Sequence, residues 1–183
     1  MHAPAKILPY VERFAREIIS NQHLMSLQYL HPAAHDSPPE QSSIDAATRL
    51  REQYGGQVIG GWAIWERPKV YFEAEFIAAW QDPDGERFYI RRPGTSGQQL
   101  LFLPDQRQPL DGRFIDNHRR ALTNDKQVAQ YLKLSADRVT LLKKAGLKTA
   151  NQVIAKTDPM RRIELDIRRL LATINERYGG WNA

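Results

Sequence analysis

Apolar residues are concentrated in the stretch from residue 55 to residue 104. β-Branched and aromatic residues are concentrated there between Gly and Pro residues, a pattern typical of β-strands. It predicts four strands, at about 57–66, 69–81, 86–91 and 98–104. Trp62 and Trp65 fall on opposite faces by strict alternation, so we expect helices or loops to cover both faces of the sheet. The strands should form an antiparallel meander.

Two segments with helical periodicity precede this predicted sheet in the chain. Apolar residues at spacings of three and four predict a first helix from about Pro4 to Asn21 and a second from Ser42 or Ser43 to Tyr54. Residues 22–40 lack periodicity and contain several Pro residues, which predicts a loop.

Helices also follow the sheet, after a polar connector at residues 105–121. They are expected at about 124–134, 135–145, 149–157 and 159–177, with Ser135 and Thr149 as N-caps and Gly146 as a stop. The expected fold class is therefore α+β: a helix-covered antiparallel four-stranded sheet followed by a basic helical C-terminal region. We expect a core domain at residues 1–121 and a tail at 122–183 packed on or beside it.

Net positive charge is confined to the last third of the chain. Residues 1–117 contain 12 Lys and Arg against 15 Asp and Glu, a net charge of −3, whereas residues 118–183 contain 14 against 6, a net charge of +8. Such asymmetry indicates a polyanionic partner, either nucleic acid or an acidic protein surface. A solvated helical face that serves solubility is the alternative.

The amino-acid composition further narrows the classes of protein to which this chain could belong. The chain has no Cys, which excludes disulfides, cysteine-ligated metals and a thiolate nucleophile. It has no apolar run near the length of a membrane span and no signal-peptide pattern, so we expect a cytoplasmic protein without membrane association. The five His residues lack metal-ligand spacing, and we expect neither a metal nor another cofactor.

Three motifs between Ser42 and Arg120 resemble a bacterial domain of unknown function associated with SecC-type motifs. They are Gly-Trp-Ala-Ile-Trp-Glu at 61–66, Glu-Ala-Glu-Phe-Ile-Ala-Ala-Trp at 73–80 and Leu-Phe-Leu-Pro-Asp at 101–105. In that family a Cys, a His and an Asp resemble a papain-like nucleophile set. Ser42, Ile77 and Tyr89 stand at those three positions here. Because isoleucine cannot accept a proton, the resemblance implies a retained fold with a vestigial site.

Glu73 and Glu75 share one face of a predicted strand and form a possible carboxylate pair. Such a pair could serve acid–base catalysis or bind a divalent metal, and with His118 it could form a nuclease site. Alternatively, the two glutamates are exposed to solvent or form ion pairs with Arg67, Arg87 or Arg91. The segment 115–121 loosely resembles the Gly-x-His-Arg signature of the ParB phosphate-binding fold, but lacks its glycine.

The segment 141–154 resembles a helix-hairpin-helix motif and is similar to the corresponding part of the C-terminal domain in the alpha subunit of RNA polymerase. In that motif a hairpin containing Gly presents backbone amides to phosphate. The residues expected to contact nucleic acid or an acidic partner are Arg119, Arg120, Lys143, Lys144, Lys148, Arg161 and Arg162.

The last predicted helix is amphipathic and could cover the core, seal a homodimer or bind a partner's groove. We expect a non-catalytic binding or regulatory protein, an inhibitor or adaptor of the kind carried by bacterial mobile elements such as plasmids. The alternatives are a DNA-binding protein, including a nuclease, and a hydrolase with Ser42 as nucleophile.

Overall fold

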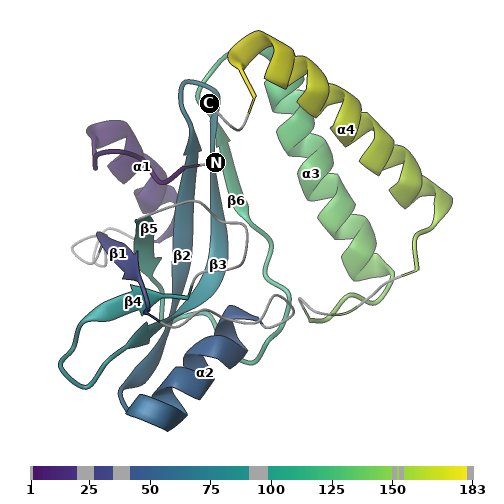
Figure 1. The fold of residues 1–183 in the computed structure, drawn as a ribbon. Coiled ribbons are helices and arrows are strands. Elements are labelled where there is room, and N and C mark those ends of the chain that lie inside the picture. Colours follow the sequence, from purple (N-terminus) through teal and green to yellow (C-terminus); the bar gives the residue numbers. More distant parts are fainter. Residues whose placement is uncertain are drawn as a thin grey trace.

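The computed structural model describes residues 2–19, 27–34, 42–90, 99–149, 152 and 155–180. In this part of the chain it has four helices and six strands (Figure 1). The helices are α1 (Pro9–Ile18), α2 (Ser43–Tyr54), α3 (Lys126–Lys144) and α4 (Asp158–Tyr178). The strands are β1 (Gln28–Pro32), β2 (Gln57–Arg67), β3 (Tyr71–Gln81), β4 (Arg87–Tyr89), β5 (Leu100–Pro104) and β6 (His118–Ala121).

Five of the strands close into a barrel. β2 and β3 form a long antiparallel hairpin in which Gln57 pairs with Gln81 and Arg67 with Tyr71. β5 adds to the other edge of β2, β1 to β5, and β4 runs parallel to β1 and antiparallel to β3. β6 pairs with β3 beyond β4, so it extends the hairpin outside the barrel.

The α+β prediction is confirmed, but the open four-stranded meander is wrong. The four predicted strands correspond to β2, β3, β4 and β5, yet β4 and β5 are not neighbours, because β1 lies between them. β1 falls in the predicted loop at 22–40 and β6 in the predicted connector at 105–121. Neither shows a run of β-branched and aromatic residues, since β1 reads Gln-Tyr-Leu-His-Pro and β6 reads His-Arg-Arg-Ala.

Side chains fill the barrel. The buried interior cluster draws on all five barrel strands and consists of Leu30, Ile59, Ala63, Ala79, Tyr89, Leu100 and Phe102. Gly61 points to the same side, and a Cβ atom there would lie only 2.4 Å from Cζ of Phe102. The missing side chain of Gly61 therefore makes room for the Phe102 ring.

Two helices cover the outside of the barrel. α1 packs Val11 and Phe14 against Trp62 and Phe72 on the outer face of the β2–β3 hairpin. α2 covers the other end of that face, where Leu50 packs near Ala78. Ser42 caps α2 as predicted, and the helix ends at Tyr54. Trp62 lies outside the barrel and Trp65 packs against its interior cluster, which confirms the predicted covering of both faces.

The C-terminal region is a two-helix hairpin rather than a run of short helices. The predicted helices at 124–134 and 135–145 are one helix, α3. Ser135 is not an N-cap, because its hydroxyl donates to the Tyr131 carbonyl inside the helix. The described residues of the predicted helix at 149–157 lie outside any helix, and Thr149 instead forms a bridge with Arg113.

Gly146 ends α3, as its position predicts. Its φ is +99°, and its amide donates to the Lys143 carbonyl (3.1 Å), while the Leu147 amide donates to the Leu142 carbonyl (2.9 Å). These two bonds satisfy carbonyl groups that the helix end would otherwise leave without partners.

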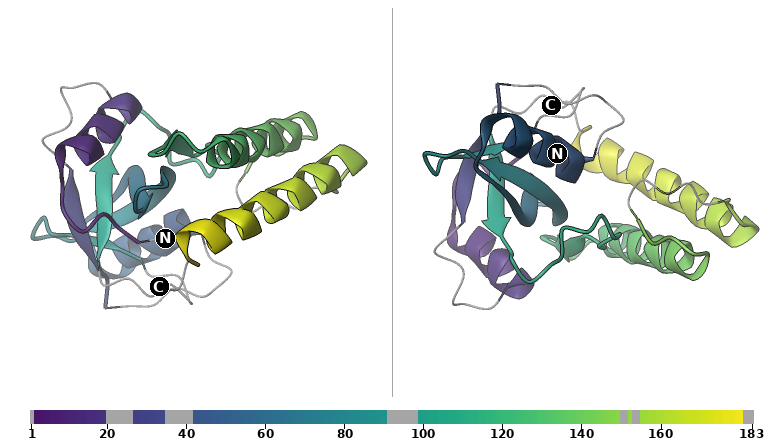
Figure 2. Two further views of the ribbon diagram at one scale, coloured as in Figure 1. Left: turned by 90° about the horizontal axis from the view of Figure 1, so that it is seen from above. Right: turned by 90° about the horizontal axis from the view of Figure 1, so that it is seen from below.

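The helical hairpin projects from the barrel on the side away from α1 (Figure 2). Asp125 caps α3 and accepts hydrogen bonds from Arg177 and Tyr178 at the end of α4. The buried guanidinium of Arg67, at the end of β2, donates to the carbonyls of Ile174 and Gly179. The Asp125 contacts join the two helices to each other, and the Arg67 contacts fasten the end of α4 to the β2–β3 hairpin. In the part of the chain that the structure describes, no helix has the length and apolar character needed to cross a membrane.

Candidate functional site

The three positions of the expected vestigial site hold no acid–base pair. Ile77 packs against the barrel interior cluster, and Tyr89 belongs to it with 7% of its surface exposed. Ser42 lies at the start of α2, where its hydroxyl accepts a hydrogen bond from the Asp45 amide (3.1 Å) and donates to the Asp45 carboxylate (2.6 Å). Ile77 and Tyr89 thus come together as core residues, and Ser42 acts as a helix cap.

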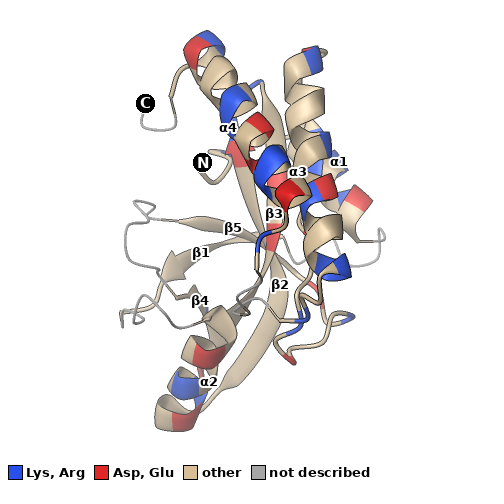
Figure 3. Ribbon diagram, turned by 90° about the vertical axis from the view of Figure 1, so that its right-hand side faces the viewer, with Lys and Arg blue, Asp and Glu red and all other residues tan. Residues whose placement is uncertain are grey.

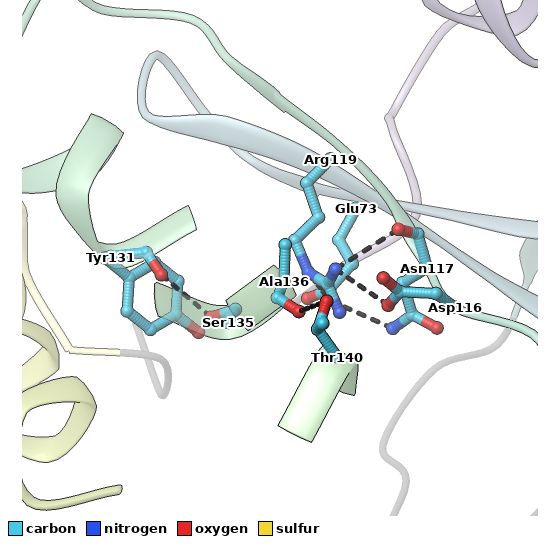
Figure 4. Close-up of polar contacts among 8 residues, drawn as sticks. All are labelled: Glu73, Asp116, Asn117, Arg119, Tyr131, Ser135, Ala136 and Thr140. Atoms are coloured by element: carbon cyan, nitrogen blue, oxygen red, sulfur yellow. Dashed lines mark hydrogen bonds and ion pairs between the residues drawn. The ribbon is translucent and has the colours of Figure 1, made fainter. Parts of the chain in front are cut away.

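Glu73 is held in a polar network on the face of β3 that α3 covers (Figure 4). Its Oε1 accepts from Arg119 Nε and from Asn117 Nδ2, both at 2.9 Å, and Arg119 also pairs with Asp116 at 3.0 Å. The side chains of Glu73 and Arg119 are only 13% and 12% exposed. Of the predicted alternatives for Glu73, an ion pair with an arginine is the one observed, but its partner is Arg119 of the unpredicted strand β6 rather than Arg67, Arg87 or Arg91.

The strand register separates His118 from the two glutamates. His118 pairs directly with Ala74, so its side chain lies on the face opposite to Glu73 and Glu75. The alternative of a nuclease site formed by these three residues is therefore not supported, because they do not come together. No group of three His, Asp or Glu side chains suited to a metal ion occurs among the described residues.

A second polar cluster, missed by sequence analysis, surrounds Asp105 where β5 ends. The Asp105 residue is 3% exposed. Its carboxylate accepts hydrogen bonds from Trp62 Nε1 (3.0 Å) and from Arg107 Nε (2.8 Å) and Nη2 (3.0 Å). Burial alone would raise the pKa of Asp105, but the hydrogen bonds from Arg107 and Trp62 outweigh it and hold the pKa below its ordinary value.

His118 packs against the same tryptophan. Its ring lies edge-on to the Trp62 ring at a centroid distance of 4.5 Å, and partial burial lowers the pKa of the imidazole. Arg107 reaches further, donating to the Ile18 carbonyl at the end of α1. The Asp105 cluster thus ties β2, β5 and α1 together. The Leu-Phe-Leu-Pro-Asp motif included Asp105, but nothing in the sequence identified Trp62 as its partner.

One open pocket of about 370 Å³ lies between α2 and the start of β2. Aliphatic side chains from Ile44, Val58 and Leu110 line it, together with the cationic side chain of Arg51. The Arg51 guanidinium lies 3.4 Å from the neighbouring Glu52 carboxylate. None of the described residues that line this pocket is a Ser, a His, an Asp or a Glu.

The predicted cationic residues divide into paired and unpaired groups. Arg119 is committed to Glu73 and Asp116, and Arg120 pairs with Glu17 of α1. Lys143, Lys144 and Lys148 gather at the end of α3, and the Lys143 ammonium lies 5.7 Å from the centre of the Phe114 ring. Among the described residues these three lysines have no carboxylate partner.

The helix-hairpin-helix geometry is absent from the described part of 141–154. The amides of Gly146 and Leu147 are used to cap α3, and the Lys148 amide donates to Gln152 Oε1 at 2.8 Å. Since these amides are bonded within the chain, the turn does not present them to a phosphate group. Ala150, Asn151, Val153 and Ile154 lie outside the described residues. The lysine side chains remain the cationic groups of this turn.

Exposed arginines extend the cationic surface along α4, where Lys and Arg positions alternate with Asp and Glu positions (Figure 3). Arg161 and Arg169 pair with Asp158 and Asp166 one turn earlier on the same helix. Arg162 and Arg168 are exposed, and neither has an ion-pair partner among the described residues.

Comparisons with protein-family models, with curated proteins and with solved structures find no significant match to this chain.

Proposed function

We propose that this chain is a non-catalytic binding protein, an inhibitor or adaptor, that engages an acidic partner through its C-terminal helical hairpin. The barrel serves as the scaffold. The observation that carries the proposal is the cationic surface of α3 and α4, much of which has no carboxylate partner in the described chain. Residues 122–183 contain 12 Lys and Arg against 6 Asp and Glu, a net charge of +6.

The ion pairs within α4 do little to neutralise this surface. Asp158, the partner of Arg161, has a side chain that is 92% exposed. Exposed pairs of this kind contribute roughly 0–1 kcal/mol, and water screens them. An acidic partner that displaces water can therefore compete for the same guanidinium groups.

The contents of the barrel support a scaffold role. Aliphatic and aromatic side chains fill its interior, and the Glu73 and Asp105 carboxylates are both bound by arginines. Ser42, the residue expected at the nucleophile position, is hydrogen-bonded in its own helix cap.

Binding to an acidic polypeptide tests the proposal. Fluorescence anisotropy of labelled polyglutamate is measured with three proteins: the wild type, Arg162→Glu/Arg168→Glu/Arg169→Glu, and a control in which Lys6, Arg13 and Arg51 are changed to Glu. Both triple variants change the net charge equally. We expect the α4 variant to lose at least about tenfold in affinity and the control to retain most of it. Equal losses in both would show that only net charge matters and would contradict the proposal.

Nucleic acid is a second candidate partner, favoured by the three lysines at the end of α3. They could make sequence-independent phosphate contacts, each of which steepens the salt dependence of binding. With a duplex of about 20 base pairs between about 50 and 200 mM salt, Lys143→Glu/Lys144→Glu/Lys148→Glu should abolish binding that the Lys6, Arg13 and Arg51 control retains. Unchanged duplex binding by the lysine variant would eliminate this candidate.

A further inference from the structure

Leu165 is the most exposed of the large apolar side chains that the structure describes, with half of its surface open to solvent. It lies at the centre of the sequence Arg-Arg-Ile-Glu-Leu-Asp-Ile-Arg-Arg, residues 161–169. This sequence is symmetric about Leu165 in residue type, since a carboxylate, an isoleucine and two arginines follow one another on each side. The whole segment belongs to α4.

Helical geometry places the four arginines around Leu165. Positions three and four residues away on either side share a face of an α-helix, so Arg161 and Arg162 lie before Leu165, and Arg168 and Arg169 after it, on one surface. With a rise of 1.5 Å per residue, the two arginine pairs are about 10 Å apart along the axis, or two turns. All four arginines are exposed. We call these five residues the Leu165 face.

The chain itself leaves this face uncovered. The apolar stripe of α4 lies on the other side of the helix, where Met160 and Ile174 are buried and Ile163 and Ile167 are partly buried. Figure 2 shows α3 beside α4 and no other described helix or strand on the side of α4 away from α3. Of the four arginines, Arg161 and Arg169 pair with the exposed carboxylates of Asp158 and Asp166. An apolar centre flanked by arginines is the arrangement of a protein interface, in which a buried anchor is enclosed by polar contacts.

We propose that the Leu165 face docks an acidic amphipathic helix of a partner protein. Leu165 packs against apolar residues of that helix, and the arginine pairs bind carboxylates one turn to either side. This inference rests on the proposed function and names its partner. Phosphate groups alone would leave Leu165 without an apolar contact. A second copy of the chain is disfavoured, because self-association across this face would bring arginines against arginines.

The test uses a synthetic peptide of about 20 residues with Leu at the a and d heptad positions and Glu on both flanks. An isomer with Lys in place of Glu is the charge control. Anisotropy titrations compare the full-length wild type with Leu165→Ser and with Leu8→Ser. Leu8 is a matched control, 43% exposed and located beside the barrel. We expect the Glu peptide to bind, Leu165→Ser to weaken it at least about tenfold, and Leu8→Ser to leave it unchanged.

Three outcomes would overturn the inference. The first is that Leu165→Ser binds the Glu peptide as tightly as the wild type does. The second is that the wild type binds the Lys peptide as tightly as the Glu peptide. The third is that duplex DNA binds the arginines of this face while the Glu peptide does not bind. If the wild type binds polyglutamate through its α4 arginines but the Glu peptide shows no dependence on Leu165, only this inference fails. If the wild type binds neither probe, the proposed function fails with it.

Discussion

At the scale of single residues, burial decides how much a local hydrogen-bonding motif contributes to the stability of the fold. Asp105 and Arg107 form the same Asp-x-Arg contact as Asp111 and Arg113: in both, the arginine amide and side chain donate to the carboxylate. The Asp105 side chain is 2% exposed and that of Asp111 46%. Of these two carboxylates, Asp105 is the one that also accepts a hydrogen bond from a buried tryptophan.

Asp105→Ala should therefore destabilise the protein by about 2 kcal/mol, because it leaves the Trp62 indole N–H without its acceptor in a buried site. Asp111→Ala should cause no measurable change, because water replaces the lost contact. Urea unfolding of the two variants checks this. Similar losses in both would show that burial around Asp105 is unimportant.

The lowered pKa of Asp105 predicts an acid-dependent stability. A carboxyl group whose pKa is lower in the folded than in the unfolded state stabilises the fold above the unfolded value, near 3.9, and loses this effect as the pH falls through the folded value. The difference in unfolding free energy between the wild type and Asp105→Asn should be largest near neutral pH and shrink below about pH 4. A difference that stays constant across this range would contradict the assigned pKa direction.

At the scale of elements, the barrel depends on a close approach at Gly61. A methyl group there would meet both Phe102 and the Leu103 carbonyl oxygen, the latter at 2.6 Å. Gly61→Ala should cost about 1–3 kcal/mol, the range for overpacking a dense core. Gly180→Ala is the matched control, since no atom lies within 4 Å of its added Cβ. Thermal unfolding compares the two, and equal melting temperatures would contradict the packing described.

The attachment of α4 depends on Arg67, whose guanidinium donates to carbonyl groups at the end of that helix. Arg67→Met should raise the amide exchange rates of α4 at least about tenfold while leaving β2, β3 and β5 protected, since local opening does not require the barrel to unfold. Hydrogen exchange measures this. Uniform acceleration throughout the chain would show instead that Arg67 supports the whole fold.

The elements differed in how far the sequence revealed them. The β2–β3 hairpin and α2 could be predicted because long runs of β-branched and aromatic residues and a cap-to-glycine pattern are local signals. β1 and β6 lack such a pattern, and the strand pairings that stabilise them join residues far apart in the chain, as when Leu30 pairs with Leu100 and Ala74 with His118. Ser135 resembled a helix start, but its hydroxyl bonds to the preceding turn, so α3 continues through it.

At the scale of the whole molecule, the exposed cationic side chains lie on the C-terminal helical hairpin, whereas the enclosed polar network around Glu73 lies on the strands. The sequence revealed the cationic last third, and the structure places its exposed lysines and arginines along α3, along α4 and in the segment between them. The sequence could not show that Arg119 is enclosed with Glu73, because that pair joins strands distant in the sequence. Nor could it show that His118 and Glu75 lie on opposite faces, since this follows from the register of β6 on β3.

Amide chemical-shift mapping of the labelled full-length protein, titrated with the acidic Glu peptide, tests the central claim most directly. We expect shifts confined to the outer face of α4 around residues 161–169, with the barrel strands unchanged. Shifts centred on Trp62 and His118, or on Ser42 and the start of α2, would place the binding site on the barrel and contradict the account.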